Sequence, residues 1–321
     1  MVLGLRGVAC CAAVRFEEAI GILKEAVVRF RAHVPGSAFE ITTAYFFLFV
    51  AMAYSGRYGE LRPLLEGALV NAKERGDRYG EIMLRLGILN STWIFAGEPG
   101  RARREIAEAR RRMPDGRFRA VNYQALVAEC YVDLYDGEYE RAYALLHATL
   151  PAVRRSLILQ LQAYRAEFAA LRGRASVACA MNAPGRRRAK LLREAMRLLP
   201  DIAATPGALG RVTARVIRAN AALIRGRTEE ALVIAEAMAG DEAGDAWLSR
   251  NSARYFLGRL RGDTALVLAA EQELASRGGV AHVGLIRLYF PAFEPEAPTD
   301  RSSPSPASSP GSGAPSSPSG P

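Results

Sequence analysis

Residues 137–142, Gly-Glu-Tyr-Glu-Arg-Ala, are one copy of a six-residue motif that decides the fold. The other copies are Gly-Arg-Tyr-Gly-Glu-Leu at 56–61, Gly-Glu-Pro-Gly-Arg-Ala at 97–102 and Gly-Arg-Thr-Glu-Glu-Ala at 226–231, with weaker copies at Gly262-Asp263, at Gly173-Arg174 and, without the glycine, at 14–19. From Gly56 to Gly262 the successive spacings, leaving Gly173 aside, are 41, 40, 89 and 36 residues. The gap of 89 residues has room for two units, with Gly173 as the turn between them.

Each copy has the residue types of a turn between two helices. Glycine supplies the left-handed conformation that ends the first helix. The acidic residues that follow suit the first turn of the next helix, because its dipole favours negative charge there. Before the motif copy at 97–102, apolar residues recur at helical spacing, at Ile82, Leu86, Leu89 and Trp93. No stretch alternates with a period of two, so we expect no sheet.

Helix pairs that repeat every 36–41 residues are typical of an α-solenoid. We predict an all-α protein in which residues 16–290 form about 12–14 antiparallel helices. The helical repeat domain is predicted to span residues 1–293. Its N-terminal edge lacks the polar cap of a solenoid end, so we expect a truncated edge that self-associates. Residues 294–321 are rich in Ser, Pro and Gly, and we predict a disordered tail.

The motif with tyrosine at its third position resembles the turn of the tetratricopeptide repeat. The best matches are 56–61, 137–142 and 226–231. The spacings exceed the usual 34 residues of that repeat, and no proline closes each unit at a fixed place, as in its long-helix, degenerate variety. Residues 253–280 resemble the end of the helical repeat region in large bacterial, myxobacterial-type Ser/Thr protein kinases and signalling ATPases. The resemblance implies a right-handed superhelix whose concave face binds a protein segment.

The basic residues are concentrated in one part of the chain. The net charge is +10, and 40 of the 43 basic residues are arginine, as is typical of a high-GC bacterial genome. Residues 154–227 hold 16 basic and three acidic residues. Within this stretch Arg211, Arg215 and Arg218 fall on one helical face, so we predict that they bind an acidic protein or peptide partner. The stretch holds only two aromatic residues on which bases could stack, so we do not expect a nucleic acid as the partner.

No catalytic motif is present in the sequence. A kinase glycine-rich loop, an HRD loop, a DFG triad, a Walker A sequence and a G-x-S-x-G elbow are all missing. The four cysteines form no CxxC pair and the three histidines lie far apart, so we predict no metal site and no cofactor. We interpret the cysteines as buried and His147 as a partly buried structural residue. The chain is therefore predicted not to be an enzyme.

The most apolar segment, Ile41 to Tyr54, has 14 residues, whereas a membrane-spanning helix needs about 20. We interpret it as a helix buried on most sides and expect a cytoplasmic protein with reduced thiols. The function predicted from these features is a non-catalytic scaffold for protein–protein interaction. The alternative is a detached C-terminal regulatory region of a bacterial Ser/Thr kinase or signalling ATPase whose catalytic domain is missing from this chain.

Overall fold

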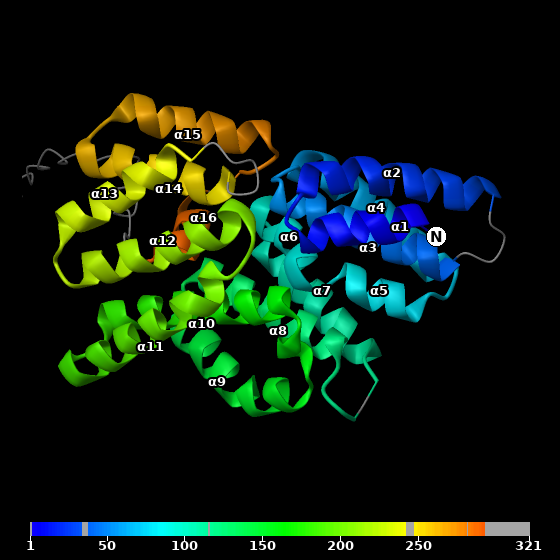
Figure 1. Cartoon of the computed structure of the whole chain (residues 1–321), viewed down its shortest axis with the longest axis horizontal. Helices are drawn as coiled ribbons and strands as arrows, with labels where there is room; N and C mark the ends of the chain where they lie inside the picture. The colour runs from blue at the N-terminus through cyan, green and yellow to red at the C-terminus, as the bar shows by residue number, and fades with distance from the viewer. Residues whose placement is uncertain (1, 34–37, 115, 242–246, 281, 293–321) are drawn as a thin grey trace, which may run out of the picture.

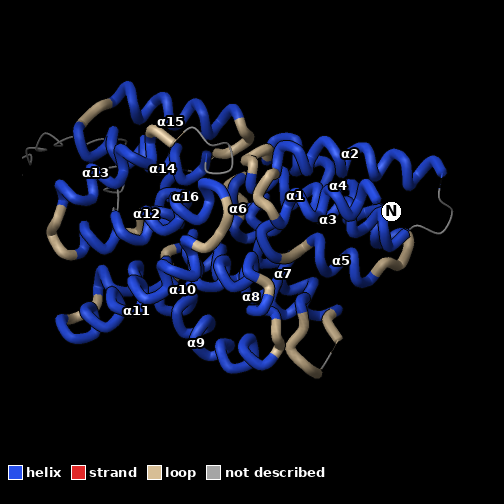
Figure 2. Tube along the Cα trace, in the orientation of Figure 1, coloured by secondary structure: helices blue, strands red, loops and turns tan. Residues whose placement is uncertain are grey.

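The chain folds into helices throughout its described part. The computed structural model describes residues 2–33, 38–114, 116–241, 247–280 and 282–292, and this part contains no strand (Figure 2). Its helices are α1 (Val2–Ala12), α2 (Phe16–His33), α3 (Ala38–Tyr54), α4 (Tyr58–Glu74), α5 (Arg78–Leu84), α6 (Ser91–Phe95), α7 (Pro99–Arg112), α8 (Ala120–Asp136), α9 (Tyr139–Arg155), α10 (Gln162–Asn182), α11 (Gly185–Ala203), α12 (Gly207–Ile224), α13 (Thr228–Ala239), α14 (Trp247–Arg261), α15 (Thr264–Ser276) and α16 (His282–Tyr289), with 3-10 helices η1 (Gly87–Asn90) and η2 (Ile158–Gln160). The all-α prediction is confirmed, and the predicted tail lies outside the described residues.

The predicted turns form at the motif glycines. Gly56, Gly97, Gly137, Gly226 and Gly262 have φ angles between 68° and 81°, so each takes the left-handed conformation. The motif copy without glycine also has a left-handed residue, Val14, whose φ is 61° at the turn between α1 and α2. A β-branched residue in this region is strained. The backbone of the motif therefore persists even where its glycine is lost.

The prediction for Gly173 is wrong. This glycine lies in the middle of α10, where a Cβ atom would lie 2.6 Å from Cδ1 of Ile217 in α12. Its role is to let two helices approach closely. The turns in the long gap use other residues, since Pro184 is the extended residue before α11 and Pro206 the one before α12.

The helix predicted through Ile82 and Trp93 is broken into α5, η1 and α6. Leu86 is extended and Gly87 has a φ of 62°, so the helix cannot continue through them. The side chain of Asn90 donates to the carbonyl oxygens of Arg85 and Ala102 and so satisfies acceptors near the break. This break contributes to a helix count above the 12–14 that we predicted for residues 16–290, since α2 to α16 are fifteen helices in the described part.

The helices from the two ends of the described chain meet. Trp247, the first residue of α14, is fully buried against the turn at Gly56. The backbone N–H of Gly59 donates to the carbonyl oxygen of Arg277 at 2.9 Å, and the Arg277 side chain donates to the carbonyl oxygen of Ser55 at 3.0 Å. Figure 1 shows the resulting arrangement, with α15 reaching toward the N-terminal helices.

Aromatic side chains fill this junction. The rings of Tyr58 and Phe95 stack with centroids 3.9 Å apart, and Phe95 meets Trp247 edge to face at 5.9 Å. The N–H of Val280 donates to the carbonyl oxygen of Phe95 at 3.2 Å. In an open solenoid each repeat contacts only its neighbours. The helical array here differs, because the start of α14 contacts α6 and the turn before α4, and residues 277–280 after α15 contact α4 and α6.

The apolar segment 41–54 and the four cysteines are buried to the extent that the sequence predicts. Every residue from 41 to 54 is buried or half-buried, which confirms the interpretation of this segment. The four cysteines are buried and unpaired, also as predicted, and burial raises the pKa of Cys11 to about 12. At the N-terminal edge, Val2 and Leu5 of α1 are exposed, while self-association stays a prediction. No helix in the described ranges is both long enough and apolar enough to cross a membrane.

We predict that Gly56→Ala and Gly137→Ala differ sharply in their cost. Both glycines are left-handed, so alanine should cost about 1 kcal/mol at either site through backbone strain. At Gly137 the new Cβ meets nothing within 4 Å, but at Gly56 it would lie 1.4 Å from Nε1 of Trp247. Gly56→Ala should therefore lose at least about 2 kcal/mol more. Urea unfolding of both variants measures the difference, and equal losses would contradict the junction.

Candidate functional site

The three predicted site arginines lie on α12, and two of them have a partner. The Arg215 guanidinium lies 3.4 Å from Oδ2 of Asp241 and donates to the carbonyl oxygen of Ala237 at 3.2 Å. Arg211 lies 3.9 Å from the same Asp241 oxygen. Arg218 is exposed and forms no ion pair or hydrogen bond with any described residue. Asp241 could not be expected near these arginines from the sequence, because it follows α13 and lies outside the basic stretch 154–227.

The other face of α12 packs into the core as predicted. Val212, Val216 and Ala219 are fully buried, while Leu223 is half-buried. The helix therefore directs its apolar residues inward and leaves Arg211 and Arg218 in contact with solvent. This arrangement keeps the two guanidinium groups accessible to an anionic partner, whereas Arg215 also fastens α12 to the end of α13.

A second arginine cluster, on α7, is neutralised within the protein. Arg101 pairs with Glu105, and Arg112 pairs with Glu108, as the spacing predicts. Arg104 stands four residues before Glu108 but forms no ion pair with it in the described structure. Other arginines of α7 reach acidic residues on α8, namely Arg103 to Asp133 and Asp136, and Arg110 to Glu129. These ion pairs fix α7 against α8 and leave little charge for a partner.

A polar cluster that no sequence motif indicates lies inside the helical array. Glu167 of α10 accepts hydrogen bonds from the hydroxyl of Tyr54 on α3, at 3.2 Å, and from that of Tyr123 on α8, at 2.9 Å. Burial raises the pKa of both phenols, so they stay protonated and donate. Burial also raises the pKa of Glu167 itself, although the two hydrogen bonds oppose the shift. One carboxyl group thus joins three helices.

Arg174 is a buried positive charge in the same region. It lies two turns after Glu167 on α10 and is 5% exposed. Its guanidinium carbon is 4.8 Å from the ring centroid of Tyr289 on α16 and 5.9 Å from that of Tyr131 on α8. Cation–π contact with both rings stabilises the charge in a site that no carboxylate within ion-pair distance neutralises among the described residues. The cluster therefore also ties α16 to the central helices.

His147 has the structural surroundings that we predicted. It is half-buried on α9, with Nε2 lying 3.0 Å from Oε1 of Glu194 on α11. Glu194 also accepts hydrogen bonds from Arg172 at 2.6 Å and from Tyr143 at 3.0 Å. This group of four side chains connects α9, α10 and α11. In the described residues no three His, Cys, Asp or Glu side chains gather as metal ligands would.

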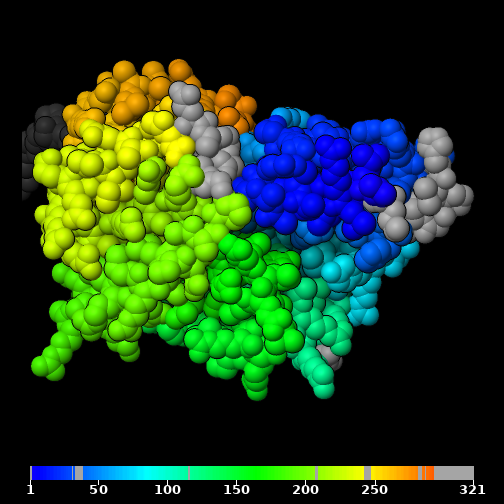
Figure 3. All heavy atoms as spheres, in the orientation of Figure 1, coloured from blue at the N-terminus to red at the C-terminus, as the bar shows by residue number. Residues whose placement is uncertain are grey.

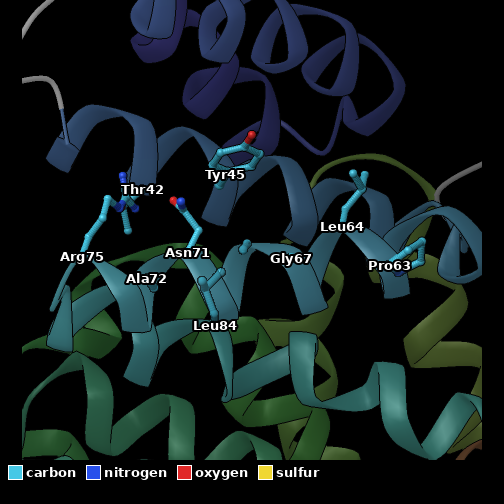
Figure 4. A pocket seen from close by; sticks show the side chains of 10 residues that line it. Thr42, Tyr45, Pro63, Leu64, Gly67, Asn71, Ala72, Arg75 and Leu84 are labelled. Carbon is cyan, nitrogen blue, oxygen red and sulfur yellow. The ribbon is translucent and has the colours of Figure 1, made fainter.

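A groove of about 310 Å³ lies between α3, α4 and α5 (Figure 4). Its lining is mainly apolar, with Tyr45 and Leu64 on its walls. Its polar groups include Thr42, whose hydroxyl donates to Asp77 at 2.7 Å, and Arg75, which lies 4.0 Å from the same Asp77 carboxylate. Thr42 and Arg75 are thus engaged with Asp77, while the side chain of Asn71 also lines the groove.

We predict that Glu167→Gln raises the melting temperature at pH 7. Because burial raises the pKa of the native carboxyl above its unfolded value, the native state binds the proton more tightly, and the free energy of unfolding falls as pH rises through that interval. Glutamine removes the charge, and its one oxygen accepts from Tyr54. Its amide nitrogen, in place of the second carboxylate oxygen, donates to the hydroxyl of Tyr123, which then donates to the carbonyl oxygen of Tyr164. The gain should shrink as the pH falls through about 4.3, the ordinary glutamate pKa, because the carboxyl then becomes protonated in both states. Circular dichroism melts from pH 4 to pH 7 measure it; a variant less stable at pH 7 would contradict the account.

No protein-family model matches the sequence, and no curated protein is significantly similar to it. The resemblance to tetratricopeptide repeats therefore stays a prediction from the motif residues, and the case for function depends on the charges, burial and contacts of the described side chains.

Proposed function

We propose that this chain is a non-catalytic scaffold that binds an acidic protein segment on its basic helical surface. The observation that carries the proposal is the exposed basic side of α12, where Arg211 and Arg218 reach solvent from a helix whose opposite side is core. This helix lies in the stretch with 16 basic and three acidic residues. Guanidinium groups bind carboxylates in paired hydrogen bonds, which suits them to an acidic peptide.

The fold proposed for this scaffold is a tetratricopeptide-like array of helix pairs. Support comes from the left-handed motif glycines, each of which separates two successive helices. The hydrogen bond between Gly59 and Arg277 adds that the array curves enough for α4 to meet the residue after α15. The proposed location is the cytoplasm, which the four unpaired, buried thiols support because reducing compartments keep thiols free.

We predict that the triple variant Arg211→Ala, Arg215→Ala, Arg218→Ala binds an acidic peptide about threefold more weakly than the native chain. Surface charges each contribute little, and Asp241 already occupies two of the three arginines. Folding should be preserved, with a stability loss of about 1 kcal/mol from the lost pairing to Asp241. Fluorescence anisotropy with a labelled glutamate-rich peptide measures the affinity, and circular dichroism checks the helix content.

A lysine-rich peptide of equal length is the control for this measurement. The native chain should bind the acidic peptide in a saturable way that weakens as salt rises, and should not bind the basic one. If the native chain binds neither peptide near physiological ionic strength, the proposed function is wrong. If the triple variant binds with unchanged affinity, the site lies elsewhere on the protein.

A further inference from the structure

A row of positive side chains runs along the exposed side of α11. Arg186, Lys190, Arg193 and Arg197 are all exposed, and their spacings of four, three and four residues place them on one helical face. At a rise of 1.5 Å per residue the row is about 16 Å long. We call these four residues the α11 row. In Figure 1 α11 lies at the outer edge of the molecule, and Figure 3 shows this green region projecting into solvent.

The α11 row has no partner within the described protein. None of its four side chains forms an ion pair or hydrogen bond with any described residue. The two acids of α11 are engaged elsewhere, since Glu194 accepts from Arg172 at 2.6 Å and Asp201 lies 4.0 Å from Arg165. The opposite side of the helix is core, with Leu191, Leu192, Ala195, Leu199 and Ile202 buried. The row is thus a fixed positive surface on a packed helix.

Comparison with α7 shows that arginine-rich composition alone does not account for the row. On α7 the arginines alternate with Glu105 and Glu108 and pair with them. Along the α11 row, by contrast, each positive side chain has another positive side chain three or four residues away, which makes three pairs of like charge. Like charges at these spacings repel each other and destabilise a helix. A bound anion would relieve this repulsion, and no described carboxylate forms an ion pair with the row.

We propose that the α11 row binds an acidic α-helical segment of a protein partner. Such a segment can present carboxylates at the same spacing, about one for each helical turn, so that each lies opposite a cation. Arginine at three of the four positions favours carboxylates through paired hydrogen bonds. The inference rests on the proposed scaffold function and gives it a surface and a partner chemistry. It places the main contact on α11, not on the α12 arginines that the sequence indicated.

A helical peptide fits this surface better than a nucleic acid does. Single-stranded nucleic acids bind where bases can stack on aromatic side chains, and α11 contains no aromatic residue. Duplex DNA requires only phosphate contacts, so it is included below as a competing probe.

The test uses the full chain and a labelled helical peptide with glutamates at i, i+4, i+7 and i+11. In the α11 variant, all four residues of the row are changed to glutamine. The matched control changes Lys73, Arg104, Arg117 and Arg225 to glutamine, which removes the same charge from exposed residues that have no partner among the described residues. We expect the α11 variant to bind at least about tenfold more weakly and the control to bind within about twofold of the native chain. A peptide with the same composition and shuffled glutamates should bind more weakly than the matched peptide.

Each other outcome overturns the inference. Equal losses in the α11 variant and the control would show that net charge alone attracts the peptide. A loss in the Arg211/Arg215/Arg218 variant with none in the α11 variant would leave the proposed function standing but move its site to α12. Tighter binding of a duplex DNA of similar length would identify a nucleic-acid surface. If the native chain binds no acidic peptide, both proposals fail together.

Discussion

The contact of Trp247 with Gly56 is the constraint on which the arrangement of the helices depends. Gly56 serves two purposes, because its φ of 71° makes the turn between α3 and α4 and its missing side chain leaves room for the indole ring. The Arg277 guanidinium carbon lies over the indole ring, 4.5 Å from its centroid, and the side chain donates to the carbonyl oxygen of Ser55. The turn before α4 and the residue after α15 are thus joined by hydrogen bonds, beside a position where a side chain would collide with the indole ring.

Local features of the fold could be predicted from the sequence, and features made by distant residues could not. The motif glycines predict the left-handed turns because glycine is the residue that takes this conformation without strain. The prediction for Gly173 failed because the sequence does not distinguish a glycine needed for close helix packing from one needed for a turn. The contact between Gly56 and Trp247 could not be predicted from the sequence. The two residues lie 191 positions apart, and no sequence motif links them.

The same limit applies to the candidate site. The sequence predicts that α12 directs Val212 inward and arginines outward, because helical periodicity fixes which side chains share a face. It does not show that Asp241 approaches Arg211 and Arg215, since the acid follows the next helix. Glu167 and Arg174 stand in the sequence as ordinary charged residues of a helix. Their burial among tyrosines of α3, α8 and α16 arises only when those helices meet.

Charge and closure together account for the surface that we propose to be functional. Arginines of α7 are paired to acids and hold helices together, whereas the α11 row faces solvent on a helix whose other side is anchored in the core. The polar cluster at Glu167 and Arg174 connects α3, α8, α10 and α16. Because α10 also packs against α11, the basic row is displayed on a rigid support. A positive surface held in this way needs little ordering when it binds.

Closure of the helical array is the central claim, and the distance between its two ends tests it most directly. Spin labels can be placed on cysteines introduced at Glu60 and Ser276, which are exposed and adjoin the 2.9 Å hydrogen bond between Gly59 and Arg277, while the four native thiols are buried. The account predicts one narrow distribution of label distances centred within about 20 Å. Helices pack about 8–10 Å apart, so an open array would separate the labels by more than about 40 Å. A broad distribution at such distances would contradict the closed arrangement.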